Sequence, residues 1–326
     1  MAAASSKTPA MVLDVDGFDV RLTNPDRVYF SERGETKLDL ANYYLSVGPG
    51  IVNALRDRPC MLHRFPKGVE GDKVHQKRLP AGAPPWVETV RLHFPRYGLH
   101  ADELCVQRLA DVIWAVQMST VEFHPWNSRR ADTEKPDEWR IDLDPMPRCG
   151  YDKVRRAAHV AHEILEELGA VGWPKTSGGR GMHVYVRIKP EHGFQQVRRA
   201  ALAFAREVER RLPDDVTTAW WRKDRSPEDL FVDYNQNARD HTIAAAYSVR
   251  GNKRGTVSAP VVWDEVDDSV PDDFTIKTMP ARFARLGDLH SSIDDAVFDI
   301  AALLEWAARD EREGQDAPPD EEQDEE

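Results

Sequence analysis

Two aspartates two positions apart, Asp142 and Asp144, have the residue type and spacing needed to hold a metal ion. They lie in the segment 140–145, whose alternation of side chains predicts a β-strand. Successive side chains of a strand point to opposite faces, so both carboxylates share one face and Ile141 and Leu143 share the other. Paired carboxylates repel each other unless a cation lies between them, and their hard oxygens suit the Mg²⁺ or Mn²⁺ of phosphoryl-transfer sites. An edge strand with a solvated acidic face is the alternative that a lone pair leaves open.

A glycine-rich segment at 177–183, Ser-Gly-Gly-Arg-Gly-Met-His, leads directly into another predicted strand. Glycine permits positive φ and close backbone approach, so the amides of this loop can face phosphate oxygens. Within it, Arg180 supplies a charged fork and His183 a further donor. An ordinary hairpin turn with an incidental arginine remains the alternative.

Three further positions carry polar groups of the same kind. Asp233 stands near the end of a predicted strand and is a candidate third metal ligand, although an isolated Asp there is more often a turn cap. His124 opens the segment 124–129, which combines imidazole, amide, hydroxyl and guanidinium donors. Arg250 begins a basic cluster at 250–254 that suits a triphosphate or a DNA backbone.

The elements that must position these residues follow from periodicity and turn signals. Predicted strands comprise a hairpin at 12–22 and segments 60–64, 86–94, 140–144, 182–188, 230–234 and 242–249. Predicted helices comprise 38–55, interrupted near 48–50, and 103–119, 154–168, 195–212 and 294–308. The order predicts a single α+β domain at 12–308, with a central, largely antiparallel sheet flanked by helices, after a flexible leader at 1–11.

Composition narrows the class of protein. The 326 residues are 41% hydrophobic, without an apolar stretch long enough to cross a bilayer or an N-terminal signal peptide. Three scattered cysteines predict a reducing compartment, by default the cytoplasm. The net charge is −12, of which residues 310–326 contribute −9, so a nearly neutral body can still contain a basic groove. The acidic segment 309–326 is predicted to be a disordered tail.

The order of the motifs resembles the archaeo-eukaryotic primase superfamily and, more closely, the polymerase domain of bacterial DNA ligase D in a stand-alone form. Three segments carry the resemblance: Arg-x-Asp-x-Asp at 140–144, the glycine-rich loop at 177–183, and Val-Asp-x-Asn-Gln-Asn at 232–237. Shorter similarities lie at 22–28, 36–40, 43–44, 57–59, 76–77, 124–126, 247–250 and 257–258. Together they span roughly residues 12–308.

The resemblance implies a role for each matching residue. The metal-binding, catalytic carboxylates would be Asp142, Asp144 and Asp233. The residues that contact the incoming nucleotide would be His124, Ser177, Arg180, His183 and Arg250. The 5′-phosphate of a downstream DNA strand would meet Arg27 and Lys37, and Lys77 would lie near the template.

The chain departs from the family pattern at three places. Arg180 and Arg27 stand where lysine is common, which keeps the charge but changes its geometry. Val74 and His75 replace two aromatic residues, which puts template stacking there in doubt. No Lys-x-Asp-Gly motif of a ligase nucleophile is present.

The implied function is a template-dependent DNA or RNA nucleotidyltransferase that extends primers and fills short gaps in end joining or repair. The family implies two divalent ions, Mn²⁺ or Mg²⁺, and a preference for ribonucleotides. Expected partners are gapped or broken DNA, nucleoside triphosphates, a Ku-like protein and a separate ligase, in the bacterial cytoplasm near the nucleoid. De novo priming, metal-dependent DNA hydrolysis and non-catalytic DNA-end binding are the alternatives.

Overall fold

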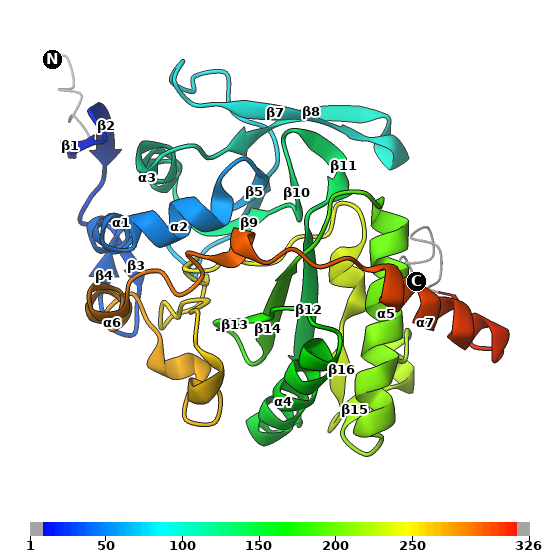
Figure 1. The fold of residues 1–326 in the computed structure, drawn as a ribbon. Coiled ribbons are helices and arrows are strands. Elements are labelled where there is room, and N and C mark those ends of the chain that lie inside the picture. Colours follow the sequence, from blue (N-terminus) through cyan, green and yellow to red (C-terminus); the bar gives the residue numbers. More distant parts are fainter. Residues whose placement is uncertain (1–8, 318–326) are drawn as a thin grey trace, which may run out of the picture.

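The computed structural model describes residues 9–317, and its strands form two five-stranded sheets and three two-stranded hairpins (Figure 1). The first sheet, here called the carboxylate sheet, has the spatial order β13 (Trp173–Thr176), β14 (Met182–Arg187), β12 (Glu138–Pro145), β16 (Leu230–Val232) and β15 (Val216–Thr217). Its neighbours are antiparallel except β15 and β16.

The second sheet is antiparallel throughout. Its order is β6 (Val74–Gln76), β5 (Pro59–Arg64), β8 (Leu99–Cys105) and β7 (Thr89–Phe94), with β9 (Thr120–Pro125) also paired to β5. The hairpins are β1 (Ala10–Val15) with β2 (Phe18–Thr23), β3 (Val28–Phe30) with β4 (Glu35–Thr36), and β10 (Ser128–Arg129) with β11 (Asp132–Pro136).

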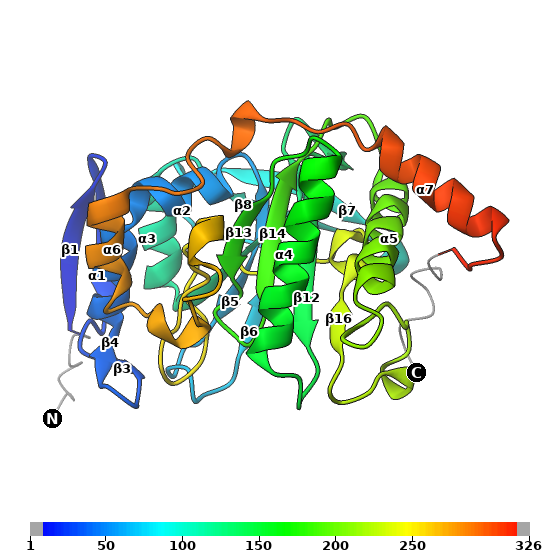
Figure 2. The ribbon, with the colours of Figure 1, turned by 60° about the horizontal axis from the view of Figure 1, so that its bottom comes forward.

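Helices pack on both sheets. They are α1 (Lys37–Ser46), α2 (Gly48–Leu55), α3 (Leu109–Gln117), α4 (Tyr151–Glu167), α5 (Phe194–Arg211), α6 (Met279–Leu286) and α7 (Ala301–Arg312). Short 3₁₀ turns lie at Pro95–Tyr97, Arg222–Asp224, Tyr234–Asn237, Trp263–Glu265, Pro271–Asp273 and Ile293–Asp295. In Figure 2, α4 lies across β12 and β14 with α5 beside it, and α3 contacts β9 of the second sheet.

The alternation along β12 divides its side chains as the sequence predicts. Trp139, Ile141 and Leu143 are buried in the main hydrophobic core, where Trp139 meets Phe204 of α5 edge-on, with ring centroids 4.7 Å apart. Asp142 lies on the opposite face of β12, away from α5. Burial of the apolar face anchors the strand, so the carboxylate face is left for the site.

The α+β class, with largely antiparallel strands flanked by helices, is confirmed, and the strands divide between two sheets. The hairpin at 12–22, the strands at 60–64 and 140–144, and the helices at 154–168 and 195–212 are also confirmed, with shifted ends. The interruption of helix 38–55 falls between α1 and α2, where Gly48 and Pro49 begin the second helix.

One predicted strand is wrong, and two predicted helices begin later than expected. The helix at 103–119 begins only at Leu109, because Glu103 and Leu104 belong to β8 and pair with β7. The segment 242–249 forms no strand beyond an isolated bridge at Val249, and it runs as irregular chain over the cavity described below. The last helix begins at Ala301 instead of residue 294, after a 3₁₀ turn at Ile293–Asp295.

The predicted boundaries of the terminal segments also shift. The tail cannot begin at residue 309, because α7 continues to Arg312 and Asp310 is fully buried near Arg206 and Arg210. At the other end, β1 already begins at Ala10. The rest of the predicted leader and tail, residues 1–8 and 318–326, lies outside the described residues.

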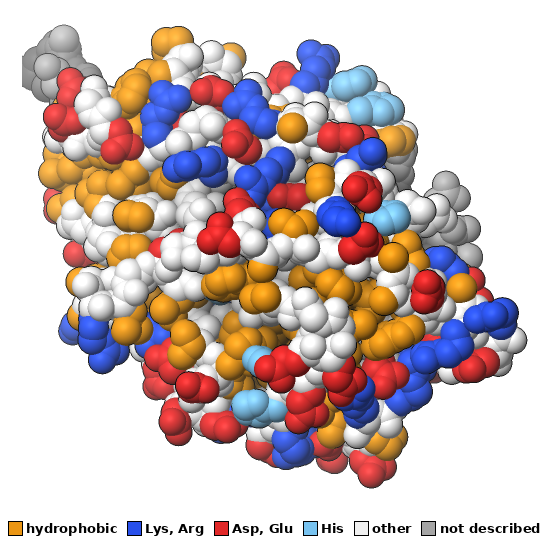
Figure 3. All heavy atoms as spheres, in the orientation of Figure 1, with side chains coloured by type: hydrophobic (Ala, Val, Ile, Leu, Met, Phe, Trp, Pro, Cys, Tyr) orange, Lys and Arg blue, Asp and Glu red, His pale blue; other side chains and the backbone are white. Residues whose placement is uncertain are grey.

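On the face shown in Figure 3, basic and acidic side chains are interspersed, as expected for a body of nearly neutral charge. Within residues 9–317, no helix has both the length and the apolar character needed to span a membrane. Cys60 and Cys105 are buried and Cys149 is partly buried, and all three are free thiols.

Candidate active site

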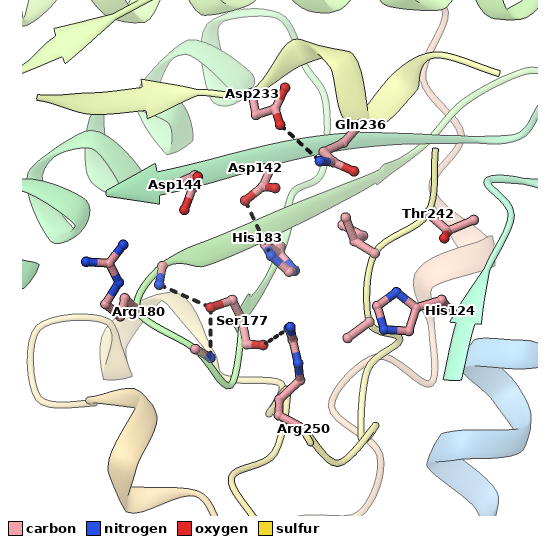
Figure 4. Close-up of a pocket in the computed structure, with 14 residues that line it drawn as sticks. His124, Asp142, Asp144, Ser177, Arg180, His183, Asp233, Gln236, Thr242 and Arg250 are labelled. Atoms are coloured by element: carbon pink, nitrogen blue, oxygen red, sulfur yellow. Dashed lines mark hydrogen bonds and ion pairs between the residues drawn. The ribbon is translucent and has the colours of Figure 1, made fainter. Parts of the chain in front are cut away.

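A cavity of about 290 Å³ lies where the carboxylate sheet faces β9 of the second sheet (Figure 4). Eight of the eleven residues singled out in the sequence line it. They are His124, Asp142, Asp144, Ser177, Arg180, His183, Asp233 and Arg250. Residues more than 100 positions apart therefore converge on one polar pocket.

The three carboxylates converge through strand pairing. Leu143 of β12 stands opposite Val232 of β16, so the chain leaving β16 places Asp233 beside Asp142. The amide of Asp233 donates to the carbonyl of Asp142 at 2.8 Å. Figure 4 shows the three carboxylates on the same side of the cavity.

A short turn after β16 holds Asp233 in place. The Asp233 carboxylate accepts hydrogen bonds from the amide of Asn235 and from Nε2 of Gln236, both at 2.9 Å. Asn237 clamps the turn onto β12, since its side chain accepts from the amide of Arg140 and donates to the Arg140 carbonyl, each at 2.8 Å. The Asn-Gln-Asn run thus fixes the third carboxylate.

The carboxylates repel one another. Burial, followed by the charges of Asp233 and Asp144, raises the pKa of Asp142 well above its usual range. Burial and the charge of Asp233 also raise the pKa of Asp144. A divalent cation among these oxygens would remove the repulsion, so the donor set fits Mg²⁺ or Mn²⁺.

The glycine-rich loop joins β13 to β14 and folds around the hydroxyl of Ser177. The amides of Gly179 and Gly181 both donate to Ser177 Oγ at 3.1 Å. Two loop amides therefore point at this hydroxyl instead of forming an open anion nest. With its lone pairs engaged, the Ser177 hydroxyl is left to donate its hydrogen to a ligand.

Two positions in the loop require glycine. Gly178 has φ +67°, and a Cβ there would lie 2.8 Å from the backbone of Val257. At Gly181 a Cβ would lie 2.2 Å from the carbonyl oxygen of Leu143. The loop thus packs directly on the strand that carries the carboxylates.

The two arginines of the site enter from different segments. Arg180 lies beside the loop and donates to the carbonyl of Pro145 at 3.0 Å, so its guanidinium is near the end of β12. Arg250 donates through Nη1 to the carbonyl of Ser177 at 2.8 Å. Figure 4 shows both side chains at the edge of the cavity, below the carboxylates.

Two histidines line the cavity from different sheets. His183 pairs with Asp142 across β14 and β12, and its Nε2 lies 3.4 Å from Asp142 Oδ1. His124 enters from β9, and its Nε2 lies 2.7 Å from Oε2 of Glu122. Burial lowers the pKa of His124 to about 3, which keeps the ring neutral at physiological pH.

Three residues singled out in the sequence lie outside the cavity lining. Arg27 and Lys37 are neighbours, because the Lys37 amide donates to the Arg27 carbonyl at 2.8 Å. Arg27 is exposed, whereas Lys37 is 3% exposed and its ammonium contacts the carbonyl of Thr23 and both oxygens of Gln117. Lys77 lies over the ring of Phe94, 4.3 Å from its centroid.

Some residues of the site were not singled out from the sequence. The lining also includes Gln236, Thr242, Ile243 and Ala244. The Asn-Gln-Asn run at 235–237 was a sequence feature that could have indicated Gln236 as a site residue. The irregular segment 242–244 contains no such feature. Glu122 was detectable, since Glu-x-His on a strand puts two polar side chains on one face.

Clustered carboxylates beside cationic donors are typical of metal-dependent nucleotidyltransferases. The comparisons with known proteins indicate the same class. A family model described as "LigD, primase-polymerase domain" matches residues 36–290. The chain therefore belongs to the LigD primase-polymerase family, whose members are DNA- or RNA-polymerising nucleotidyltransferases.

Similar proteins carry this domain within longer chains. The chain is 32% identical over 268 residues to the "Multifunctional non-homologous end joining protein LigD" of Pseudomonas aeruginosa, covering 82% of this chain and 32% of that protein. It is 30% identical over 271 residues to the "Bifunctional non-homologous end joining protein LigD" of Bacillus subtilis, covering 82% and 43%. The chain thus spans less than half the length of these curated relatives.

A solved structure matches the fold. It is the "Polymerase Domain from Mycobacterium tuberculosis Ligase D in complex with DNA", with a TM-score of 0.78 and 27% sequence identity. The match covers 84% of this chain and 97% of that one.

Proposed function

We propose that this chain extends the 3′ end of a DNA primer by templated nucleotidyl transfer and fills short gaps at DNA breaks. The observation that carries the proposal is the cavity itself. It sets Asp142, Asp144 and Asp233 opposite donors from the glycine-rich loop and from Arg250. Carboxylates to hold metal and cations to hold phosphate are the two requirements of phosphoryl transfer.

Two divalent ions, Mn²⁺ or Mg²⁺, are the cofactors that this donor set suits. Asp142, Asp144 and Asp233 would hold them, since their side chains offer only oxygen ligands and the pKa of Asp142 is raised by burial and by the charges of the other two carboxylates. When bound, such ions lower the pKa of a primer 3′-hydroxyl and stabilise the departing pyrophosphate.

The other residues act on the triphosphate. Arg180 and Arg250 would neutralise charge that builds up on the phosphoryl oxygens, and the Ser177 hydroxyl would donate to one of them. His124 and His183 border the same space and would help to orient the nucleotide. The template base would select the nucleotide by pairing, so protein contacts to DNA would be mainly to its backbone.

The Arg27 and Lys37 pair is proposed to recognise the 5′-phosphate at the far side of a gap. Arg27 is exposed and can contact a phosphate directly. The buried Lys37 supports the turn that carries Arg27, because its ammonium donates to the Thr23 carbonyl at 3.1 Å. Lys77, partly buried on the second sheet, is proposed to lie near the template strand.

The names of the relatives support a proposal for the pathway and the partners. Curated relatives are named as non-homologous end joining proteins, so DNA ends with short gaps are the proposed substrate. A Ku-like end-binding protein and a separate ligase are proposed partners, and ribonucleotides are the proposed preferred substrates. This role would place the protein in the bacterial cytoplasm at the nucleoid.

Primer extension on a short gap tests the proposal. The assay compares gaps with and without a 5′-phosphate, Mn²⁺ with Mg²⁺, and ribo- with deoxyribonucleotides. Templated addition that disappears in an Asp142→Ala/Asp144→Ala variant supports it. DNA binding without any addition, or DNA cleavage in the absence of nucleotides, would contradict it.

A matched pair of variants tests the phosphate site. Arg27→Ala is expected to remove the advantage of a 5′-phosphate while leaving thermal stability unchanged. Lys37→Met removes three buried hydrogen bonds and is expected to lower stability as well, by roughly 1–3 kcal/mol. An unchanged phosphate preference in Arg27→Ala would reject this site.

A further inference from the structure

A buried carboxylate lies directly behind the cavity on β9. Glu122 stands two residues before His124, so their side chains share one face of the strand. Glu122 does not line the cavity, and 7% of its side chain is exposed. Two of the groups that it meets, His124 and Arg250, line the cavity.

Four groups converge on this carboxylate. Oε2 lies 3.0 Å from Nδ1 of His63 and 2.7 Å from Nε2 of His124. Oε1 accepts from the amide of Gly251 at 2.6 Å, and Nε of Arg250 lies 3.6 Å from Oε2. One side chain thus links β5, β9 and the segment that carries Arg250.

The contacts decide which nitrogen of His124 can meet a ligand. Burial opposes ionisation, but hydrogen bonds from His124 and His63 and the charge of Arg250 hold the pKa of Glu122 well below its usual range. An ionised carboxylate only accepts hydrogen bonds, so Nε2 of a neutral His124 must carry the hydrogen. The other nitrogen, Nδ1, is buried and has no hydrogen-bond partner among the described residues.

His63 holds the arrangement from behind. Its ring stacks on that of His124, with centroids 3.7 Å apart, while its Nδ1 shares the Glu122 oxygen. The backbone of Gly251 approaches equally closely, since a Cβ there would lie 2.2 Å from the Phe65 ring and 3.0 Å from Glu122 Oε1. Close packing on both sides leaves the carboxylate little freedom to rotate.

A metal site is the competing interpretation, because ligand atoms of His63, Glu122 and His124 all lie within 4.8 Å of one another. The guanidinium of Arg250 opposes it, since Nε lies 3.6 Å from the oxygen that a dication would need. The Gly251 amide already occupies the other oxygen. Hydrogen bonding therefore accounts for the cluster better than coordination does.

We propose that Glu122, braced by His63, is the positioning residue that holds Arg250 in place for the triphosphate of the incoming nucleotide, and His124 in place to accept a hydrogen bond from the same nucleotide. The proposal rests on the nucleotide-binding function proposed above and adds a residue that touches no substrate. Its action is electrostatic and geometric: one charge orients two side chains from different segments of the chain.

The first test is nucleotide binding to Glu122→Gln, which keeps the size of the side chain and removes its charge. Loss of charge-assisted hydrogen bonds should weaken binding of a nucleoside triphosphate by roughly tenfold or more. In extension assays KM should rise more than kcat falls, while DNA affinity stays unchanged. His159→Ala, on the exposed side of α4, is the matched control and should bind nucleotide as the wild type does.

The second test measures the tautomer of His124 directly. Nitrogen-detected NMR of the imidazoles should show His124 as the Nε2–H tautomer in the wild type and as a mixture in Glu122→Gln and Glu122→Ala. A purely structural role would lower thermal stability without this change in tautomer. The readout needs no catalysis, so it remains informative if primer extension fails.

The outcomes separate the two proposals. A mixed tautomer in the wild type, or unchanged nucleotide affinity in both Glu122 variants, would overturn the positioning role. Stoichiometric Zn²⁺ or Co²⁺ binding that is lost in His63→Ala would overturn it too, by making Glu122 a ligand. A wild-type protein that binds no nucleotide would contradict the proposed function, while the tautomer measurement would still decide what Glu122 does to His124.

Discussion

The side-chain nitrogen Nζ of Lys175 lies 2.7 Å from Nδ1 of His183, the histidine whose ring also meets Asp142. Lys175 is fully buried, and its other partners are the carbonyl of Ala244 at 2.9 Å and Oγ of Ser258 at 2.6 Å. Burial, followed by the charges of Arg250 and Arg140, lowers the pKa of Lys175 well below its usual range. The contact with Lys175 holds the His183 ring so that its other nitrogen, Nε2, faces Asp142 at 3.4 Å. Lys175 therefore determines how His183 meets the metal-binding group.

Lys175→Met should remove the contact that orients His183, while it preserves much of the side-chain volume. Loss of a group that orients residues around a metal site typically lowers activity or metal affinity by roughly 10–100-fold. Nucleotide addition by the variant should fall by a factor in this range, with DNA affinity unchanged. Lys189→Met, at an exposed ion pair with Asp299, is the control, and equal rates for the two variants would refute the prediction.

Asp142→Asn should make the free protein more stable and inactive at once. Burial and the charges of Asp233 and Asp144 disfavour the ionised form of Asp142 and raise its pKa. The substitution removes this cost of a buried charge, and it also removes a ligand that the metal needs. Activity should fall by roughly a hundredfold or more. Mn²⁺ should raise the melting temperature of the wild type but not that of the variant. Asp214→Asn, at an exposed position, should respond to Mn²⁺ as the wild type does, and a stabilising effect of Mn²⁺ on Asp142→Asn would count against these ligands.

Gly181→Ala should separate the glycine-rich loop from β12. The new methyl group would lie 2.2 Å from the Leu143 carbonyl and 3.0 Å from the Pro145 ring, so the backbone has to move. The free energy of unfolding should fall by roughly 1–3 kcal/mol from the overpacking alone. Activity should fall as well. Gly179→Ala is the matched comparison, since its nearest contact is the Ser177 hydroxyl at 3.3 Å. Equal loss of stability in thermal unfolding of the two variants would show that the contact with β12 is not responsible.

Glu103, which lies away from the active site, should make the free energy of unfolding depend on pH. It is fully buried on β8, and burial raises its pKa to about 8 from an ordinary value of 4.5. The folded state then binds more protons than the unfolded state between these two values, so stability falls as pH rises from about 4.5 to 8. Glu103→Gln should remove this slope and stabilise the protein most at pH 8 and above, on the order of several kcal/mol.

Denaturant unfolding of the wild type and Glu103→Gln at pH 5, 7 and 9 measures the effect. Glu88→Gln, on the partly exposed side of the same sheet, should leave the slope as it is in the wild type. A stability difference between wild type and Glu103→Gln that is constant across the three pH values would reject the assignment.

Much of the site could be predicted from local patterns. The period of two along 140–145 put Asp142 and Asp144 on one face, because alternation in a strand does not depend on its neighbours. The glycines of the loop 177–183 predicted close backbone approach to phosphate oxygens, whereas the structure shows Gly181 packed against the carbonyl of Leu143. The ordered motifs then indicated the family that the comparisons confirm.

Other features depended on contacts between distant segments. Glu103 was assigned to a helix because its neighbours continue the apolar pattern of α3, but pairing with β7 makes it part of β8. Residues 242–249 have the composition of a strand, yet they run as irregular chain along the cavity. Local propensity cannot foresee which backbone groups another strand will pair with.

The sequence by itself determined the chemistry available to this protein: the carboxylates, the glycine loop and the cations, each with a local pattern that predicts its strand or turn. Only the tertiary structure decided how they meet. The register of β12 against β16 brings in Asp233, and the second sheet delivers His124 to the same cavity. The buried residues behind them, Lys175 and Glu122, have roles that exist only through these contacts. The reason is physical, because side-chain alternation is a local property whereas strand register and sheet packing are set by the burial of the whole chain.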